Sequence, residues 1–123
     1  MASSVGFHEN EAVLTPATKD RHRALASLQE ELEAIDWYDQ RVDATADDEL
    51  KQILAHNRDE EKEHAAMTLE WLRRHDPALD RMLRQYLFTE LPVTEVESAP
   101  MTGEGTADPQ GSSDGSLGIG SLR

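Results

Sequence analysis

The residues best suited to chemistry in this sequence are a carboxylate and an imidazole, Glu61 and His64, which stand three positions apart. The spacing of apolar residues around them predicts a helix. At about 100° per residue, the two side chains would lie roughly 60° apart on one helical face, so both could reach one metal ion. A carboxylate together with an imidazole suits iron, manganese or zinc.

Four-helix bundles build di-iron sites from a Glu-x-x-His motif on each of two helices and one Glu on each of two others. This chain has one such motif and one further suitable carboxylate, Glu31, beside an apolar stripe. Burying a carboxylate without a partner costs several kcal/mol. An ion pair with Lys or Arg across the interface is the alternative explanation, but Lys62 points about 100° away from Glu61. The chain therefore carries half a site, and a symmetric dimer would complete it.

Two long helices must hold these residues, and apolar spacing predicts both. The first should begin after Thr15, which can cap it, and should continue to Val42 with no Gly or Pro after Pro16. The second should be capped by Thr45 and run to about His75. Each helix has one apolar stripe, so we expect the two to pack as an antiparallel hairpin.

The sequence divides into four segments of different character. Residues 1–14 form a weakly patterned arm that should be flexible, and residues 15–92 form the helical domain, which closes with a short third helix. That third helix should cover about 77–89, and order should end at Pro92. Residues 93–114 form a polar tether that should be disordered. In residues 115–123 apolar side chains return, namely Leu117, Ile119 and Leu122.

Composition narrows the classes of function. With 25 acidic and 12 basic residues the formal net charge is −13, which argues against nucleic acid or anionic membranes as partners and favours cations. There is no cysteine, so a disulfide framework and a thiolate metal site are excluded. No apolar run approaches the ~20 residues of a membrane span, and the N-terminus lacks a signal pattern. We therefore expect a soluble protein made in the cytoplasm.

Further candidate ligands lie away from the apolar stripes. One group shares the outward face of the first helix: Glu30, Glu33 and Trp37. Another shares one face of the second helix: His56, Glu60 and Glu63. An acidic face exposed to water would explain the carboxylates equally well, so secondary cation sites and simple solvation both stay open. A tryptophan on an outward face is more typical of an interface.

Three stretches resemble a known family. Residues 30–41, EELEAIDWYDQR, resemble the first helix of the encapsulated ferritins, and residues 54–72, LAHNRDEEKEHAAMTLEWL, resemble the second. Residues 116–122, SLGIGSL, resemble the cargo-loading peptide that docks inside encapsulin shells. The resemblance covers residues 21–90 and the tip of the tail. It implies an all-α fold, in which an antiparallel two-helix hairpin with a short third helix dimerises into a ferritin-like four-helix bundle.

The resemblance also implies a function. The family oxidises Fe(II) to Fe(III) with O2 at a di-iron site between subunits, and its dimers assemble into a decameric ring. The residues that match its iron ligands are Glu31, Glu61 and His64. The family cannot store mineral itself, so the iron would be stored inside an encapsulin nanocompartment in a prokaryotic cytoplasm.

Other matching residues have supporting roles in the family. The region through which iron enters is matched by Glu30, Glu33 and Trp37, and Tyr38 lies near the di-iron site. An auxiliary cation site between subunits is matched by His56, Glu60 and Glu63. Calcium is a candidate structural cation for that site. Contact with the encapsulin shell protein would be made by Leu117, Ile119 and Leu122.

Two other functions share part of this pattern. A rubrerythrin-like di-metal peroxidase would use the same ligands, with manganese as a possible metal or peroxide as the oxidant. Metal content and the relative rates with O2 and peroxide would separate it from a ferroxidase. A non-catalytic cargo adaptor would bind Ca²⁺ or Zn²⁺ through the same acids and would take up no O2 when given Fe(II).

Overall fold

The computed structural model describes residues 6–98. Its elements are a 3₁₀ turn and four α-helices: η1 (Glu11–Val13), α1 (Pro16–Ala44), α2 (Asp48–Arg74), α3 (Pro77–Tyr86) and α4 (Val93–Val96). The described part of the chain contains no strand, so the predicted all-α fold is confirmed. The candidate docking segment at residues 115–123, and all of the tether after residue 98, lie outside the described residues.

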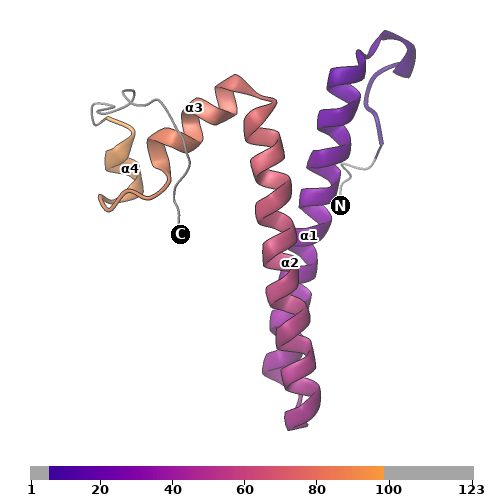
Figure 1. The fold of residues 1–123 in the computed structure, drawn as a ribbon, viewed down its shortest axis with the longest axis vertical. Helices are drawn as coiled ribbons and strands as arrows, with labels where there is room; N and C mark the ends of the chain where they lie inside the picture. Colours follow the sequence, from indigo (N-terminus) through magenta and orange to yellow (C-terminus); the bar gives the residue numbers. More distant parts are fainter. Residues whose placement is uncertain (1–5, 99–123) are drawn as a thin grey trace. The chain divides into compact units, whose positions relative to one another are not determined.

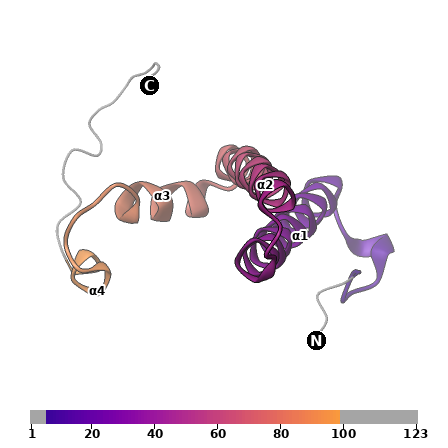
Figure 2. The same cartoon turned by 90° about the horizontal axis from the view of Figure 1, so that it is seen from below.

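The two long helices, α1 and α2, form the predicted antiparallel hairpin. In Figure 1, α2 returns beside α1 from the short turn that joins them, and Figure 2 shows the pair still side by side when viewed from below. Within residues 6–98, none of the helices combines the length and apolar character that crossing a membrane requires.

Helix caps set the limits of the hairpin, and one of them differs from expectation. Thr15 caps α1 as predicted, because its Oγ1 accepts a hydrogen bond of 3.1 Å from the backbone N–H of Thr18. The predicted cap of α2, Thr45, is wrong: Asp47 caps that helix by accepting from Leu50 N at 2.7 Å. A carboxylate is the stronger acceptor and also suits the positive end of the helix dipole. Thr45 is instead the C-cap residue of α1.

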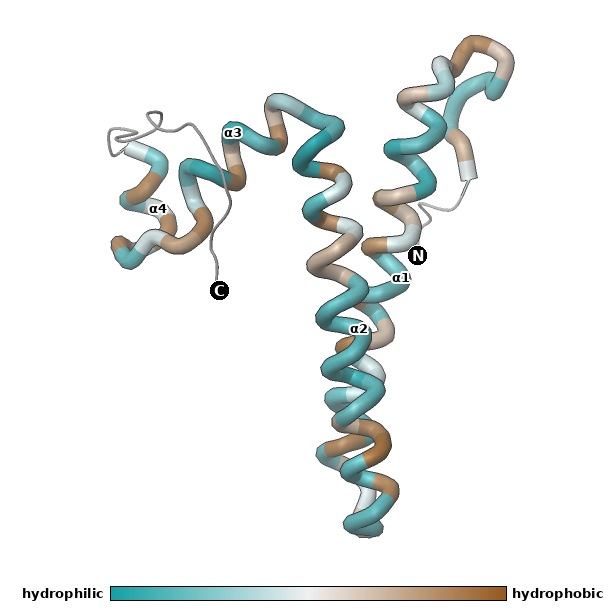
Figure 3. The backbone as a smooth tube through the Cα atoms, in the orientation of Figure 1, coloured by the Kyte–Doolittle hydropathy of each residue, from teal (hydrophilic) through white to brown (hydrophobic). Residues whose placement is uncertain are grey.

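The hairpin buries little of its own apolar surface. Only Ala65 and Leu72 are buried among its described residues, whereas Leu32, Ile53 and Met67 are each more than half exposed. Figure 3 shows apolar residues interleaved with polar ones along both long helices. Small chains with so thin a core usually gain stability from a partner subunit. The exposed apolar side chains are therefore available to a second surface.

The C-terminal end of α2 is held by a carboxylate between two arginines. Glu70 accepts two hydrogen bonds of 2.8 Å from Arg73 and one of 2.7 Å from Arg74 Nε. The bonds from Arg73, and to a smaller extent the bond from Arg74, lower the pKa of Glu70 to about 2 against an opposing effect of partial burial. Both arginines also suit the negative end of the helix dipole.

Part of the N-terminal segment contacts α1, contrary to the expected flexible arm. The rings of Phe7 and His22 lie 4.8 Å apart, and Lys19 Nζ lies 3.4 Å from Glu11 Oε2. The sequence offered no periodic pattern here because the contacts depend on a single short turn, η1. Asn10 caps that turn through its side-chain oxygen.

The residues that follow the hairpin depart from expectation in two ways. Helix α3 ends at Tyr86, earlier than predicted, and Phe88 has a left-handed backbone with φ of 62° that a helix cannot continue through. Order also does not end at Pro92, because α4 follows it directly. A proline stops a helix before it but can begin one after it, and the Pro92 carbonyl accepts from the backbone N–H of Val96 at 3.2 Å. Helix α4, and α3 from its second residue onward, lie in a second compact unit that begins at Ala78.

Candidate metal centre

The carboxylate–imidazole pair predicted from spacing lies together on α2. Nδ1 of His64 lies 3.6 Å from Oε1 of Glu61, which is close but longer than a hydrogen bond. The Glu61 side chain is 26% exposed and that of His64 is 46% exposed. Both groups are therefore near one another and open to an approaching ion.

Glu31 reaches the same stretch of α2 from the opposite helix. The hydroxyl of Thr68, one turn beyond His64, donates a hydrogen bond of 3.4 Å to Glu31 Oε2. The other carboxylate oxygen, Oε1, is buried and has no hydrogen-bond partner. Leaving a buried acceptor unsatisfied costs about 1–3 kcal/mol, and more when the group is charged. This oxygen is therefore suited to a cation that would satisfy it.

The basic side chains nearest in sequence are committed to other acids. Arg58 lies 3.1 Å from Asp39 on α1 and 3.1 Å from its neighbour Asp59. Hydrogen bonds to Asp59 and then Asp39 raise the pKa of Arg58. Lys62 lies 3.8 Å from Asp59. Within residues 6–98, no Lys or Arg pairs with either candidate metal carboxylate, so a single copy of the chain does not supply the cation of an ion pair.

The three candidate ligands fit a metal ion in type but do not complete a site. In the part of the chain that the structure describes, no group of three or more His, Asp or Glu side chains is close enough together to hold a metal ion. An unsatisfied carboxylate oxygen, a second carboxylate and an imidazole are nevertheless donors that suit iron, manganese or zinc. A single copy of the chain therefore presents an incomplete donor set.

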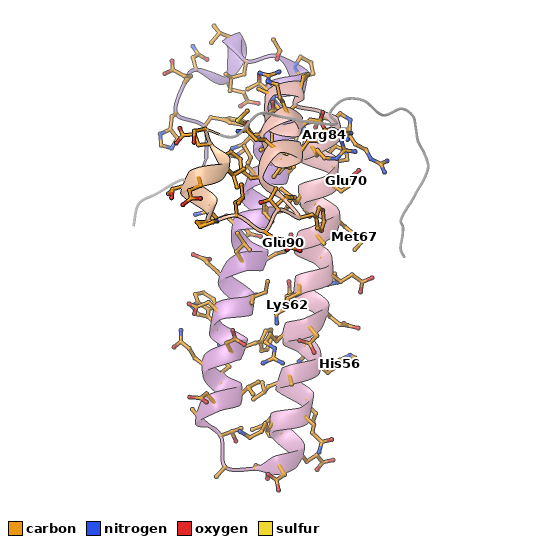
Figure 4. All side chains as sticks on the ribbon, turned by 90° about the vertical axis from the view of Figure 1, so that its left-hand side faces the viewer. His56, Lys62, Met67, Glu70, Arg84 and Glu90 are labelled. Carbon is orange, nitrogen blue, oxygen red and sulfur yellow. The ribbon has the colours of Figure 1, made fainter. Side chains whose placement is uncertain are left out.

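The predicted auxiliary group is exposed on α2. His56 Nε2 lies 3.3 Å from Glu60 Oε2, and the two side chains are 68% and 55% exposed. Glu63 is also exposed. Figure 4 labels His56 and, further along the same helix, Lys62. The structure brings two of the three candidates together at the surface, where solvation accounts for them as readily as a cation does.

The outward face of α1 carries a shallow hollow beside the other predicted group. Trp37 is 52% exposed and lines an open hollow of about 330 Å³ with Gln40 and Arg41. The Arg41 guanidinium lies 5.4 Å from the centre of the Tyr38 ring. Both candidate acids of this face, Glu30 and Glu33, are exposed. The hollow leaves the tryptophan open to a second surface.

Thr68 is the residue of this region that sequence reasoning missed. It lies at helical spacing between Ala65 and Leu72, the two buried apolar residues of α2, a position that usually indicates a packing role. The available signal was its spacing, four residues after His64, which places both on neighbouring turns of one face.

Comparisons with known families and proteins give matches over most of the length of this chain. A family model described as EncFtn-like matches residues 6–90. An encapsulated ferritin-like protein of Rhodospirillum rubrum is 61% identical, over 98% of this chain and 90% of its own. A ferritin-like protein of Thermotoga maritima is 51% identical over 94% of this chain and 96% of its own.

Two further matches concern a cargo protein and a solved structure. An encapsulin nanocompartment cargo protein of Myxococcus xanthus is 45% identical over 42% of this chain and 39% of its own. A crystal structure of a Nitrosomonas europaea protein superposes with a TM-score of 0.69 at 62% identity, covering 72% of this chain and 97% of that one. The family model and the long matches together show that this chain belongs to the EncFtn-like family of encapsulated ferritins.

Proposed function

We propose that this protein is a ferroxidase, which oxidises Fe(II) to Fe(III) with O2 at a di-iron site. The observation that carries the proposal is the buried, unsatisfied Oε1 of Glu31, on the helix that faces the Glu61–His64 pair. An anionic oxygen without a partner attracts a cation more strongly in a partly buried site than in water. Among residues 6–98 of one chain, the basic side chains nearest in sequence, Arg58 and Lys62, pair with Asp39 and Asp59 instead, which disfavours a structural ion pair within the chain.

The complete site would form between two copies of the chain. One copy supplies two carboxylates and one imidazole, and a two-fold axis would double this set to four and two. The exposed apolar residues Leu32, Ile53 and Met67 would gain a partner in the same step. Such a dimer would be a ferritin-like four-helix bundle, and dimers would assemble further into the decameric ring that the resemblance implies.

The carboxylate and imidazole side chains would have different roles in the reaction. A bound pair of Fe(II) ions would supply one electron each to O2. The carboxylates hold Fe(II) and favour Fe(III) after oxidation, because anionic ligands stabilise the higher charge. His64 would contribute an imidazole nitrogen as a further donor. The net charge of −13 would attract Fe(II) from solution.

The supporting groups would act on the passage of iron and on assembly. We assign Glu30, Glu33 and Trp37 to the region through which iron enters, where exposed acids can pass a cation inward. Tyr38 would stand near the di-iron site. We assign the remaining outward group to an auxiliary cation site, with calcium as its candidate ion: His56, Glu60 and Glu63.

We further propose that the C-terminal segment docks on an encapsulin shell protein, so that the oxidised iron is stored inside the compartment. Support comes from the names of two similar proteins, an encapsulated ferritin-like protein and an encapsulin cargo protein. The docking side chains would be Leu117, Ile119 and Leu122. Each could contribute about 1.5–3 kcal/mol if fully buried in a groove of the shell.

Aerobic addition of Fe(II) to purified, metal-free protein tests the catalytic proposal. We expect O2 uptake coupled to Fe(III) formation, with native mass spectrometry showing that iron converts monomers into dimer-based assemblies. Glu61→Ala and His64→Ala should each abolish the fast phase, because symmetry removes the ligand from both halves of the site. Equal oxidation rates in the parent and both variants would show that the site lies elsewhere, and faster turnover with peroxide than with O2 would favour the peroxidase.

A further inference from the structure

One hydroxyl, that of Thr68 on α2, lies between the candidate ligand on α1, Glu31, and the turn of α2 that carries His64. Thr68 Oγ1 lies 3.4 Å from Glu31 Oε2 and 3.1 Å from the backbone oxygen of His64. A threonine hydroxyl has only one proton, so it can donate fully to one of these acceptors at a time. The contact to Glu31 is the longer one, and it is therefore a weak bond that orients the carboxylate without fixing it.

The position of this bond decides which carboxylate oxygen is open to a metal. Thr68 occupies one side of the Glu31 carboxylate at Oε2, whereas Oε1 is left buried and unpartnered. A glutamate side chain loses considerable rotamer freedom when it is ordered, so a neighbouring donor that narrows its orientations favours metal binding. Thr68 also contacts the backbone carbonyl of His64, so the position of its hydroxyl is fixed relative to the turn that carries the imidazole. The bond to Glu31 thereby orients the carboxylate relative to the same turn.

We propose that Thr68 is a positioning residue for the metal site, which turns Oε1 of Glu31 toward the bound ion. The inference rests on the proposed function, since it assumes that Glu31 is a ligand. Removing a side chain that orients a metal ligand typically lowers metal affinity or activity about 10–100-fold. The length of the Thr68–Glu31 contact places the expected loss at the lower end, about tenfold.

Titration of the full-length, metal-free protein with Co²⁺ tests the proposal without relying on iron oxidation. Visible absorption of bound Co²⁺ reports both affinity and ligand geometry. We expect Thr68→Val to weaken binding about tenfold and to change the absorption spectrum. Thr68→Ser, which keeps the hydroxyl, should restore both. Far-ultraviolet circular dichroism of each metal-free variant would check that helicity is unchanged, and Thr68→Ala would replace the valine variant if it folds poorly.

A matched control and a ligand variant separate the possible outcomes. Thr89 donates to the carbonyl of Tyr86 at 2.8 Å, so Thr89→Val also removes a hydroxyl–carbonyl bond and should leave Co²⁺ binding unchanged. If Thr68→Val binds like the parent while Glu31→Ala does not, the positioning role is wrong and the metal site stands. If Thr68→Ser binds as weakly as Thr68→Val, the loss reflects packing, which also overturns the role. If Glu31→Ala binds like the parent, the proposed function itself fails.

Discussion

The unsatisfied carboxylate of Glu31 should make the metal-free protein less stable than it could be. Glu31→Met replaces the carboxylate by an apolar side chain of similar length, so it removes the buried, unpartnered Oε1. The cost of that oxygen is about 1–3 kcal/mol, and the bond lost at Oε2 is weak at 3.4 Å. We therefore expect the free energy of unfolding of the metal-free variant to exceed that of the parent by about 1–2 kcal/mol.

Binding of metal should reverse this order. A ligand present at 100 times its dissociation constant stabilises the folded state by about 2.7 kcal/mol, and only the parent retains its full donor set. Urea unfolding followed by circular dichroism, with chelator and then with saturating Mn²⁺, measures both states at one protein concentration. Glu33→Met is the control for metal-free stability, because Glu33 is exposed on the same helix and its loss should change stability by less than about 0.5 kcal/mol.

Either of two results would refute part of this reasoning. If Glu31→Met is less stable than the parent in chelator, the carboxylate is already satisfied in the metal-free protein, and the argument from its unpaired oxygen fails. If metal stabilises the variant as much as the parent, Glu31 is not a ligand. The measurement in chelator thus tests whether Glu31 Oε1 is unsatisfied, and the measurement with Mn²⁺ tests whether Glu31 is a metal ligand.

Three further perturbations have expected outcomes. The folded-state pKa of Glu70 is about 2, below its ordinary value of 4.5, so its contribution to the free energy of unfolding is fully present above pH 4.5 and disappears as the pH falls toward 2. Between pH 4.5 and 2, Glu70→Gln should therefore lose less stability than the parent in acid unfolding. The difference should be under ~1 kcal/mol, because the Glu70 side chain is 41% exposed. A double-mutant cycle on Asp39→Asn and Arg58→Gln should give a favourable coupling that shrinks with added salt, and a coupling that salt leaves unchanged would contradict a cross-helix ion pair reached by solvent. Deletion of residues 116–123 should prevent co-purification with a co-expressed encapsulin shell while leaving the oxidation rate unchanged, and equal loading of truncated and full-length protein would remove the docking role.

Helix periodicity and helix capping, which depend on residues close together in the sequence, determined the local features of this protein. The three-residue separation of Glu61 and His64 is sufficient to bring them together on a helix, and the structure places them 3.6 Å apart. The start of α1 after Thr15 followed in the same way from a side chain and the backbone it caps. The same local rules predicted Thr45 as the cap of α2 and missed Asp47, two residues further on, whose carboxylate is the stronger acceptor.

Only the tertiary structure decided how the two helices are placed along one another. Apolar stripes give the direction in which each helix faces, but they leave its axial register open, since sliding by one turn preserves the stripe. The contact of Glu31 with Thr68, and the burial of the Glu31 oxygen that it leaves unpaired, depend on that register. The sequence thus determined which side chains are suitable metal ligands, and the packing of α1 on α2 determined which oxygen of Glu31 is left without a partner.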